Sequence, residues 1–175
     1  MFFSLMLALL ATDESLPIKV TKMRDKLTDE RVIAATVENG GDKLHFVCNQ
    51  TDQSLFAYVN TKRYWPYNPV FYPHHRFDNE APRQVRWSRS TENAYIDSDR
   101  ENARFFMAAA SSQHVLIRLY EAAGELPVDV EFSFLSGINT PAEALETLIA
   151  ACSSSPVGKL ILAARAKAQK RRSEQ

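Results

Sequence analysis

Two cysteines, Cys48 and Cys152, carry the most reactive side chains of this chain. An even number of cysteines favours pairing in an oxidising compartment, and two cysteines allow a single pairing. The bridge would close a ring of about 100 residues, which the chain-entropy account values at roughly 4–5 kcal/mol before any native strain. The alternative is a pair of buried free thiols in a cytosolic protein. Neither cysteine has a nearby histidine or a CxxC partner, which disfavours redox or metal chemistry.

Histidines offer the next candidate chemistry, but their spacing is not that of a metal site. His45, His74, His75 and His114 form no HExxH or HxH arrangement. Two of them are adjacent, so on a strand they would point to opposite faces. We interpret all of them as surface or loop residues. The segment 155–159 (SPVGK) also lacks the first glycine of a phosphate loop, and no nucleophile motif is present. The sequence thus predicts no metal, no cofactor and no enzymatic activity.

An aromatic segment between residues 64 and 72 is the strongest candidate for recognition. It contains prolines, which are excluded from central strands, so it is predicted as a loop or an edge. Tyrosine and tryptophan are enriched at protein interfaces, and exposed apolar patches usually mark contacts. The alternative is that these rings cap the open end of a sheet. The predicted binding surface consists of Tyr64, Trp65, Tyr67, Phe71 and Tyr72.

The C-terminal end is basic although the whole chain is neutral. The 175 residues hold 21 Lys+Arg and 21 Asp+Glu, and this balance argues against nucleic acid as the main partner. After the serine-rich stretch 153–155, residues 156–175 are predicted to be a flexible basic tail, in which residues 160–170 could form a helix. It could contact an anionic surface, and the alternative is a solvated terminus. The charges proposed for this contact are Lys167, Lys170, Arg171 and Arg172.

The N-terminal residues 1–11 (MFFSLMLALLA) carry no charge and are nearly all apolar. A helix of this length is too short to cross a bilayer, which needs about 20 residues. The segment is typical of the apolar core of a secretory signal peptide, although the basic n-region is missing. The alternative is an apolar N-terminal element that is buried in the fold. We therefore expect an exported, periplasmic protein.

Strand patterns dominate the part of the chain between these ends. Alternation places Leu44, Phe46 and Cys48 on one face of a strand, and the turn 39–42 (NGGD) before it is a strong hairpin signal. Residues 23–30 are predicted as a short helix or turn. The predicted strands are 32–38, 43–48, 54–60, 75–78, 84–88, 114–120 and 128–134.

Two helices have clear start signals. Ser98, three residues before Glu101, predicts a capping box at the start of a helix over residues 99–110. Thr140, with proline next and glutamate three residues on, predicts a second helix whose apolar face ends at Cys152. A bridge from that cysteine would join the helix to the inner face of the strand layer. Residues 12–155 are therefore expected to form a single α+β domain, an antiparallel sheet or sandwich with two packed helices and one disulfide.

Several short motifs follow one another in a characteristic order: Thr28-Asp29-Glu30, Leu44 to Cys48, His75 to Asp78, Trp87-Ser88, Phe105-Phe106, Val115 to Arg118, Phe132 with Phe134, Gly137, and Ala150 to Cys152. This order, over residues 20–152, resembles the VasI/TagO family of exported proteins associated with bacterial type VI secretion. The resemblance implies a periplasmic accessory protein and brings no catalytic residues. The segment 65–73 and the basic tail depart from the family pattern.

The resulting hypothesis is an exported periplasmic accessory or binding protein that acts through protein–protein contacts in the envelope, and the family resemblance implies an association with type VI secretion. It is predicted to bind no nucleic acid. Two alternatives remain at this point: a cell-wall hydrolase or an inhibitor of one, and a prophage-encoded envelope protein of the same fold.

Overall fold

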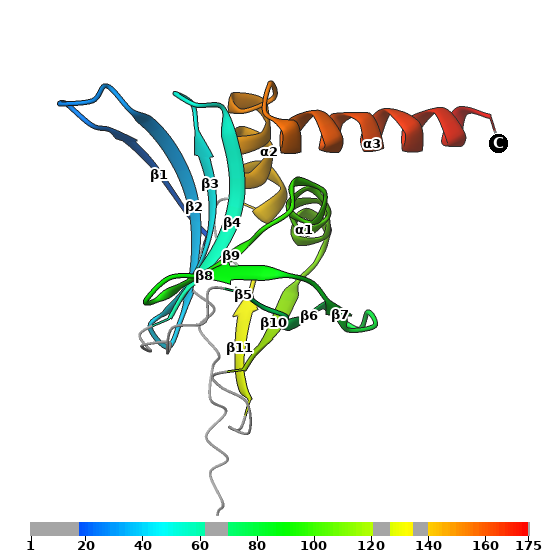
Figure 1. Cartoon of the computed structure of the whole chain (residues 1–175). Helices are drawn as coiled ribbons and strands as arrows, with labels where there is room; N and C mark the ends of the chain where they lie inside the picture. The colour runs from blue at the N-terminus through cyan, green and yellow to red at the C-terminus, as the bar shows by residue number, and fades with distance from the viewer. Residues whose placement is uncertain (1–17, 62–69, 121–126, 135–139, 175) are drawn as a thin grey trace, which may run out of the picture.

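The computed structural model describes residues 18–61, 70–120, 127–134 and 140–174 (Figure 1). Within these ranges the chain forms two antiparallel sheets and three helices. The larger sheet has the order β1-β2-β3-β4-β9-β8-β5: Lys19–Arg24, Arg31–Asn39, Asp42–Asn49, Ser54–Asn60, Asn93–Ile96, Trp87–Arg89 and Val70–Phe71. The smaller sheet has the order β11-β10-β6-β7: Val128–Ser133, His114–Leu119, His74–Phe77 and Arg83–Gln84. The helices are α1 (Asp99–Ser111), α2 (Pro141–Ala151) and α3 (Pro156–Ser173).

Strands β1 to β4 form a meander of consecutive hairpins. The turn between β2 and β3 is the predicted one, and its two glycines, Gly40 and Gly41, have φ values of 59° and 97°. Residues other than glycine rarely adopt this left-handed region, so the turn requires glycine, which has no Cβ atom, at these positions. The turn fixes the register of the pair, in which Leu44 lies opposite Val37 and Cys48 opposite Ile33.

The main core lies between the larger sheet and the helices. In Figure 1 the helices lie on one side of strands β1 to β4. Alternation sends Phe46, a fully buried residue at the centre of β3, toward that side, where its ring meets the rings of Phe105 and Phe106 at 6.0 and 5.1 Å. The smaller sheet adds Phe132 and Leu119 to the same continuous cluster. The α+β architecture with packed helices is as predicted.

The predicted bridge is present and joins the two layers. Cys48 and Cys152 form a disulfide with a Cα–Cα distance of 5.8 Å, and both residues are fully buried. Cys152 is the C-cap of α2, whose start has the predicted capping box at Thr140 and Glu143. The bond therefore ties the end of α2 to the inner face of β3.

Helix α1 is anchored to the larger sheet by one buried amide. The side chain of Asn102 is only 3% exposed. Its oxygen accepts a hydrogen bond from the backbone N–H of Ala57 at 2.9 Å, and its nitrogen donates to the carbonyl of Ile96 at 2.9 Å. Because α1 lies over β4 and β9 at this point, both backbone groups would otherwise be buried without a partner.

The C-terminal segment differs from the flexible tail predicted for residues 156–175. Helix α3 occupies Pro156–Ser173, and Val157 and Ile161 on its first turns belong to the buried core. The serine-rich stretch before it is a tight corner, where the Ser155 hydroxyl accepts from the N–H of Gly158 and donates to the carbonyl of Cys152. The short apolar stretch at the start of the tail was therefore a packing signal.

The Gly158 position allows a very close approach at this corner. A Cβ atom placed there would lie 2.4 Å from the carbonyl oxygen of Cys152, far inside van der Waals contact. At this corner, α2 and α3 are bent by 119° relative to each other. Among the described helices, none is by itself long and apolar enough to cross a membrane.

Short elements are only partly as predicted. Residues 23–30, predicted as a short helix or turn, hold the end of β1 and then a turn, in which the Asp25 carboxylate accepts from the N–H groups of Leu27 and Thr28. The predicted strand 84–88 is divided between β7 and β8, which belong to different sheets. Strands β1, β5 and β9 were not predicted, because each is short or lies at an edge.

Removing the disulfide should destabilise the fold without changing it. We expect the Cys48→Ala/Cys152→Ala double variant to lose about 4 kcal/mol of unfolding free energy, because the bridge closes a loop of sequence separation 104. Urea unfolding of the wild type with and without reductant measures the same quantity. The double variant is the control and should not respond to reductant. Equal midpoints for oxidised and reduced wild type would contradict this expectation.

Replacing the anchoring amide should also be costly. Asn102→Ala leaves a buried N–H and a buried carbonyl unpaired, so we expect a loss of about 2–4 kcal/mol in chemical denaturation. Asn93→Ala, which removes a part-buried amide pair with Asn60 at the sheet rim, is the matched control and should cost under about 1 kcal/mol. Similar costs for the two variants would show that the amide of Asn102 does not anchor α1.

Candidate binding surface

The structure describes only part of the predicted aromatic surface. Tyr64, Trp65 and Tyr67 lie outside the described residues. Phe71 is 6% exposed and packs edge-on against Trp87, so it belongs to the core and not to an exposed surface. Strand β5 pairs with β8 at the end of the larger sheet, with Phe71 opposite Trp87. Phe71 thus fits the alternative interpretation, in which the rings cap the open end of the sheet. Tyr72, by contrast, is 55% exposed.

A second aromatic surface lies on the side of the larger sheet that faces away from the helices. Side chains alternate along each strand, so the neighbours of the core residues of β1, β2, β3, β4 and β9 point to this opposite side. Together they line a hollow of about 420 Å³. We call this surface the aromatic face, and it comprises Thr21, Met23, Val32, Ala34, Thr36, His45, Val47, Phe56, Tyr58 and Tyr95.

Strand register builds a row of rings across the aromatic face. Tyr58 on β4 lies opposite His45 on β3 and opposite Tyr95 on β9. The rings of His45 and Tyr58 stack with centroids 4.6 Å apart, and those of Tyr58 and Tyr95 lie 5.2 Å apart. Phe56 extends the cluster, at 6.1 Å from Tyr58. Offset aromatic pairs at these distances add about 0.5–1.5 kcal/mol each beyond the area they bury, so the row is a rigid platform.

Small residues of the aromatic face are buried although none of the described helices covers them. Ala34 is 7% exposed and Val47 is 6% exposed, and neither belongs to the main core cluster. The surrounding aromatic side chains shield them from water. Met23 at the edge strand is 55% exposed and continues the apolar surface to the rim.

The centre of the aromatic face is uncharged at neutral pH. Burial lowers the pKa of the His45 imidazole, and Lys43 lowers it further while Glu38 opposes both. Thr36 shares a hydrogen bond of 2.9 Å with the Nδ1 atom of His45. Burial also raises the pKa of the Tyr58 hydroxyl. Charge is found at the rim, where Lys43 and Glu38 pair at 3.6 Å.

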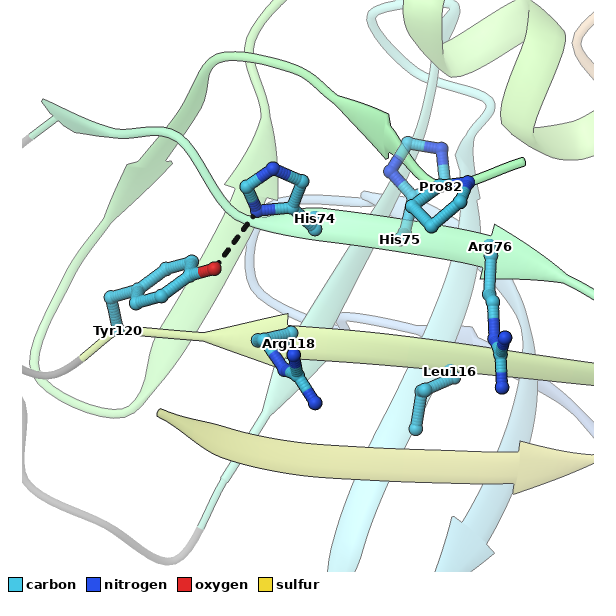
Figure 2. Close-up of a pocket in the computed structure, with 7 residues that line it drawn as sticks. All are labelled: His74, His75, Arg76, Pro82, Leu116, Arg118 and Tyr120. Carbon is cyan, nitrogen blue, oxygen red and sulfur yellow. Dashed lines mark hydrogen bonds between the residues drawn. The ribbon is translucent and has the colours of Figure 1, made fainter. Parts of the chain in front are cut away.

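A smaller hollow of about 310 Å³ lies on the outer face of the smaller sheet. Figure 2 shows its lining: His74, His75, Arg76, Pro82, Leu116, Arg118 and Tyr120. Three of its polar side chains are already engaged within the fold. The hydroxyl of Tyr120 and the Nδ1 atom of His74 lie 3.0 Å apart, and Arg118 forms two hydrogen bonds with Asp129 at 2.7 and 2.6 Å.

His75 differs from the surface or loop histidine that was predicted. It is 6% exposed, and its ring contacts those of Phe77, Trp87 and Phe105. Burial is the main cause that lowers the pKa of His75 to about 4, and Arg83 adds to the effect. Neither its Nδ1 atom nor the indole nitrogen of Trp87 has a hydrogen-bond partner among the described residues. The residue is a neutral member of the core, because it occupies an inward position of β6.

No metal centre is evident in the described part of the chain, where no group of three or more histidine, cysteine and acidic side chains is placed to hold an ion. Of the basic residues predicted as a contact, Lys167, Lys170, Arg171 and Arg172 all lie on the exposed half of α3. None of these four residues lines either hollow.

Comparison with known proteins gives no match. No protein-family model, no curated protein and no solved structure matches this chain. The likeness to the VasI/TagO family therefore remains a prediction from its motifs.

The burial of His75 gives a pH dependence with a defined sign. Its folded-state pKa of about 4 lies below the ordinary value of 6.5, so the unfolded chain takes up this proton first as the pH falls. The stability from this group is complete above pH 6.5 and is lost between pH 6.5 and 4, with about 2 kcal/mol lost at pH 5. We expect His75→Phe to lack this part of the acid sensitivity in urea unfolding at pH 7.5 and pH 5.

His45 is retained in both proteins of that comparison, so its contribution cancels. Parallel loss of stability in wild type and His75→Phe between the two pH values would show that His75 is not held neutral by the fold.

Proposed function

We propose that the protein is an exported binding module of the bacterial envelope and that its aromatic face contacts a protein partner. The observation that carries the proposal is the uncharged row of rings on a rigid sheet face that no described helix covers. The family resemblance suggests, as part of the proposal, that the partner belongs to a type VI secretion system. Without that resemblance, the proposal is a protein-binding module of the envelope.

The chemistry of the aromatic face is that of an interface centre. Interface centres are depleted of charge and enriched in tyrosine, phenylalanine and methionine, and charged residues surround them. Met23, Phe56 and Tyr58 supply the apolar and aromatic contacts here, and the Lys43–Glu38 pair lies at the rim. An exposed apolar patch with polar borders on a monomer usually marks a contact site.

The breadth of the aromatic face favours a protein over a small molecule. Its lining comes from five adjacent strands, which at about 4.8 Å per strand spacing spans roughly 20 Å. Small-molecule sites are usually closed clefts that surround most of the ligand, whereas this surface is a broad sheet face. A rigid sheet also loses little conformational entropy on binding, which preserves affinity.

The sulfur chemistry supports the proposed compartment. Disulfides persist in oxidising environments such as the periplasm and are rare in reducing cytosol. The Cys48–Cys152 bridge supports export for this reason, together with the apolar N-terminal residues 1–11 predicted as a signal.

Partner recovery from the envelope should depend on the aromatic face. We expect Tyr58→Ala/Tyr95→Ala to reduce recovery of the partner captured by wild type by at least about tenfold, because aromatic side chains at an interface centre carry most of the binding energy. Thr21→Arg, which adds a charge to the same face on an edge strand without removing a ring, should have the same effect. Quantitative affinity purification measures this, and a single cooperative melting transition above the assay temperature checks that each variant is folded.

The matched control is Tyr72→Ala, which removes an exposed ring from the sequence-predicted surface. We expect it to recover the partner as the wild type does. Loss of the partner with Tyr72→Ala, and its retention with the two aromatic-face variants, would move the interface to the aromatic segment 64–72.

A further inference from the structure

Helix α3 extends from the body of the protein, and its C-terminal end points away from both sheets (Figure 1). Its first turns are packed, and Ile161 is its last buried residue. From residue 166 to residue 174 every position is exposed. An exposed helical segment of this length is marginal in water by itself, so it gains from a surface on which to lie.

The charge of α3 has one sign. Within its bounds the helix contains six basic residues and no acidic one: Lys159, Arg165, Lys167, Lys170, Arg171 and Arg172. Arg165 is bound to the body, since its guanidinium donates to the Glu146 carboxylate at 2.8 Å. The ion pair of Lys170 with Glu174 is long, at 3.9 Å, and well exposed. Exposed pairs of this kind contribute little, so a concentrated positive surface remains.

The side of α3 that faces away from the body combines these cations with apolar side chains. Helical periodicity places Lys159, Ala163, Ala166 and Lys170 in one row, opposite the buried Val157 and Ile161. Leu160 and Leu162 flank this row and are 42% and 45% exposed. Lysine stems can lie along an apolar surface while their charged ends reach polar groups.

We propose that this outer side of α3 docks the protein on an anionic phospholipid bilayer. Leu160 and Leu162 enter the headgroup region, and Lys159, Lys167 and Lys170 contact lipid phosphates. A nucleic acid would satisfy the cations but would offer no apolar phase to the leucines, which favours lipid. The inference goes beyond the proposed function and does not depend on it, because the aromatic face lies on the other side of the larger sheet from the helices (Figure 1).

Co-sedimentation of the full chain with vesicles tests the proposal. The probes are vesicles of neutral phosphatidylcholine and vesicles that contain phosphatidylglycerol. We expect binding to the anionic vesicles, little binding to the neutral ones, and weaker binding as salt rises from 50 to 300 mM, because screening shortens the range of the attraction. Equal binding to both kinds of vesicle would overturn the proposal.

Variants separate α3 from the rest of the surface. Each cation near an anionic membrane contributes about a fivefold gain in affinity, so Lys159→Gln/Lys167→Gln/Lys170→Gln should weaken binding by at least about tenfold. Lys19→Gln/Lys22→Gln/Lys26→Gln removes the same charge from β1 and its turn and should bind as the wild type does. Leu160→Ser/Leu162→Ser should also lose most binding, and it alters only exposed side chains.

Three further results would overturn the docking proposal: equal losses for the two lysine triples, unchanged binding of the leucine variant, or tighter binding to a duplex oligonucleotide than to anionic vesicles. Each of these leaves the partner-recovery test of the aromatic face unaffected. Conversely, aromatic-face variants that lose the partner should still bind anionic vesicles, so failure of one proposal is distinguishable from failure of the other.

Discussion

The bond between Cys48 and Cys152 joins the middle of the larger sheet to the corner at which α2 ends and α3 begins. The carbonyl of Cys152 accepts hydrogen bonds from both the backbone and the hydroxyl of Ser155, so the corner is built directly on the bridged residue. Cys152 therefore holds both α2 and α3 in position against the inner face of β3. Both surfaces of functional interest are therefore fixed relative to the same covalent link.

The larger sheet has more apolar surface than its helices can cover. Strands β3 and β4 carry buried side chains such as Phe46 on the helix side and rings such as Tyr58 on the other. A sheet with one solvated face normally alternates apolar and polar residues, whereas a run that is apolar on both faces is typical of a strand covered on both sides. The aromatic face departs from what stability of the isolated fold requires, and function is the natural source of such departures.

Much of the fold was readable from local signals. The capping residues Ser98 and Thr140, the glycine turn after Asn39 and the alternation around Cys48 each act over a few residues, and they predicted α1, α2, the hairpin of β2 and β3, and the bridge. The two-sided pattern of 54–60 was visible too, with Phe56 and Tyr58 opposite Leu55 and Val59. The sequence did not show which of these two faces is buried, because only the tertiary structure decides which face the helices cover.

The remaining site residues depend on long-range pairing. Tyr95 lies in the short strand β9, and its neighbour Tyr58 is 37 positions earlier, so no local pattern brings their rings together. His75 and Phe71 look exposed in a polar or proline-rich context, yet strand pairing turns both inward. The start of α3 was concealed by the serines before it, since its packing rests on only a few apolar side chains, among them Val157 and Ile161.

The absence of a side chain at Gly158 sets the direction in which α3 extends. From this position to Ser173 the helix rises about 22 Å at 1.5 Å per residue. A methyl group there would overlap the Cys152 carbonyl, so the corner from which α3 starts would have to shift. By that geometry, a rotation of only about ten degrees would displace the tip by roughly 4 Å. The hydrogen atom that Gly158 has in place of a Cβ atom thus determines where the basic end of α3 lies.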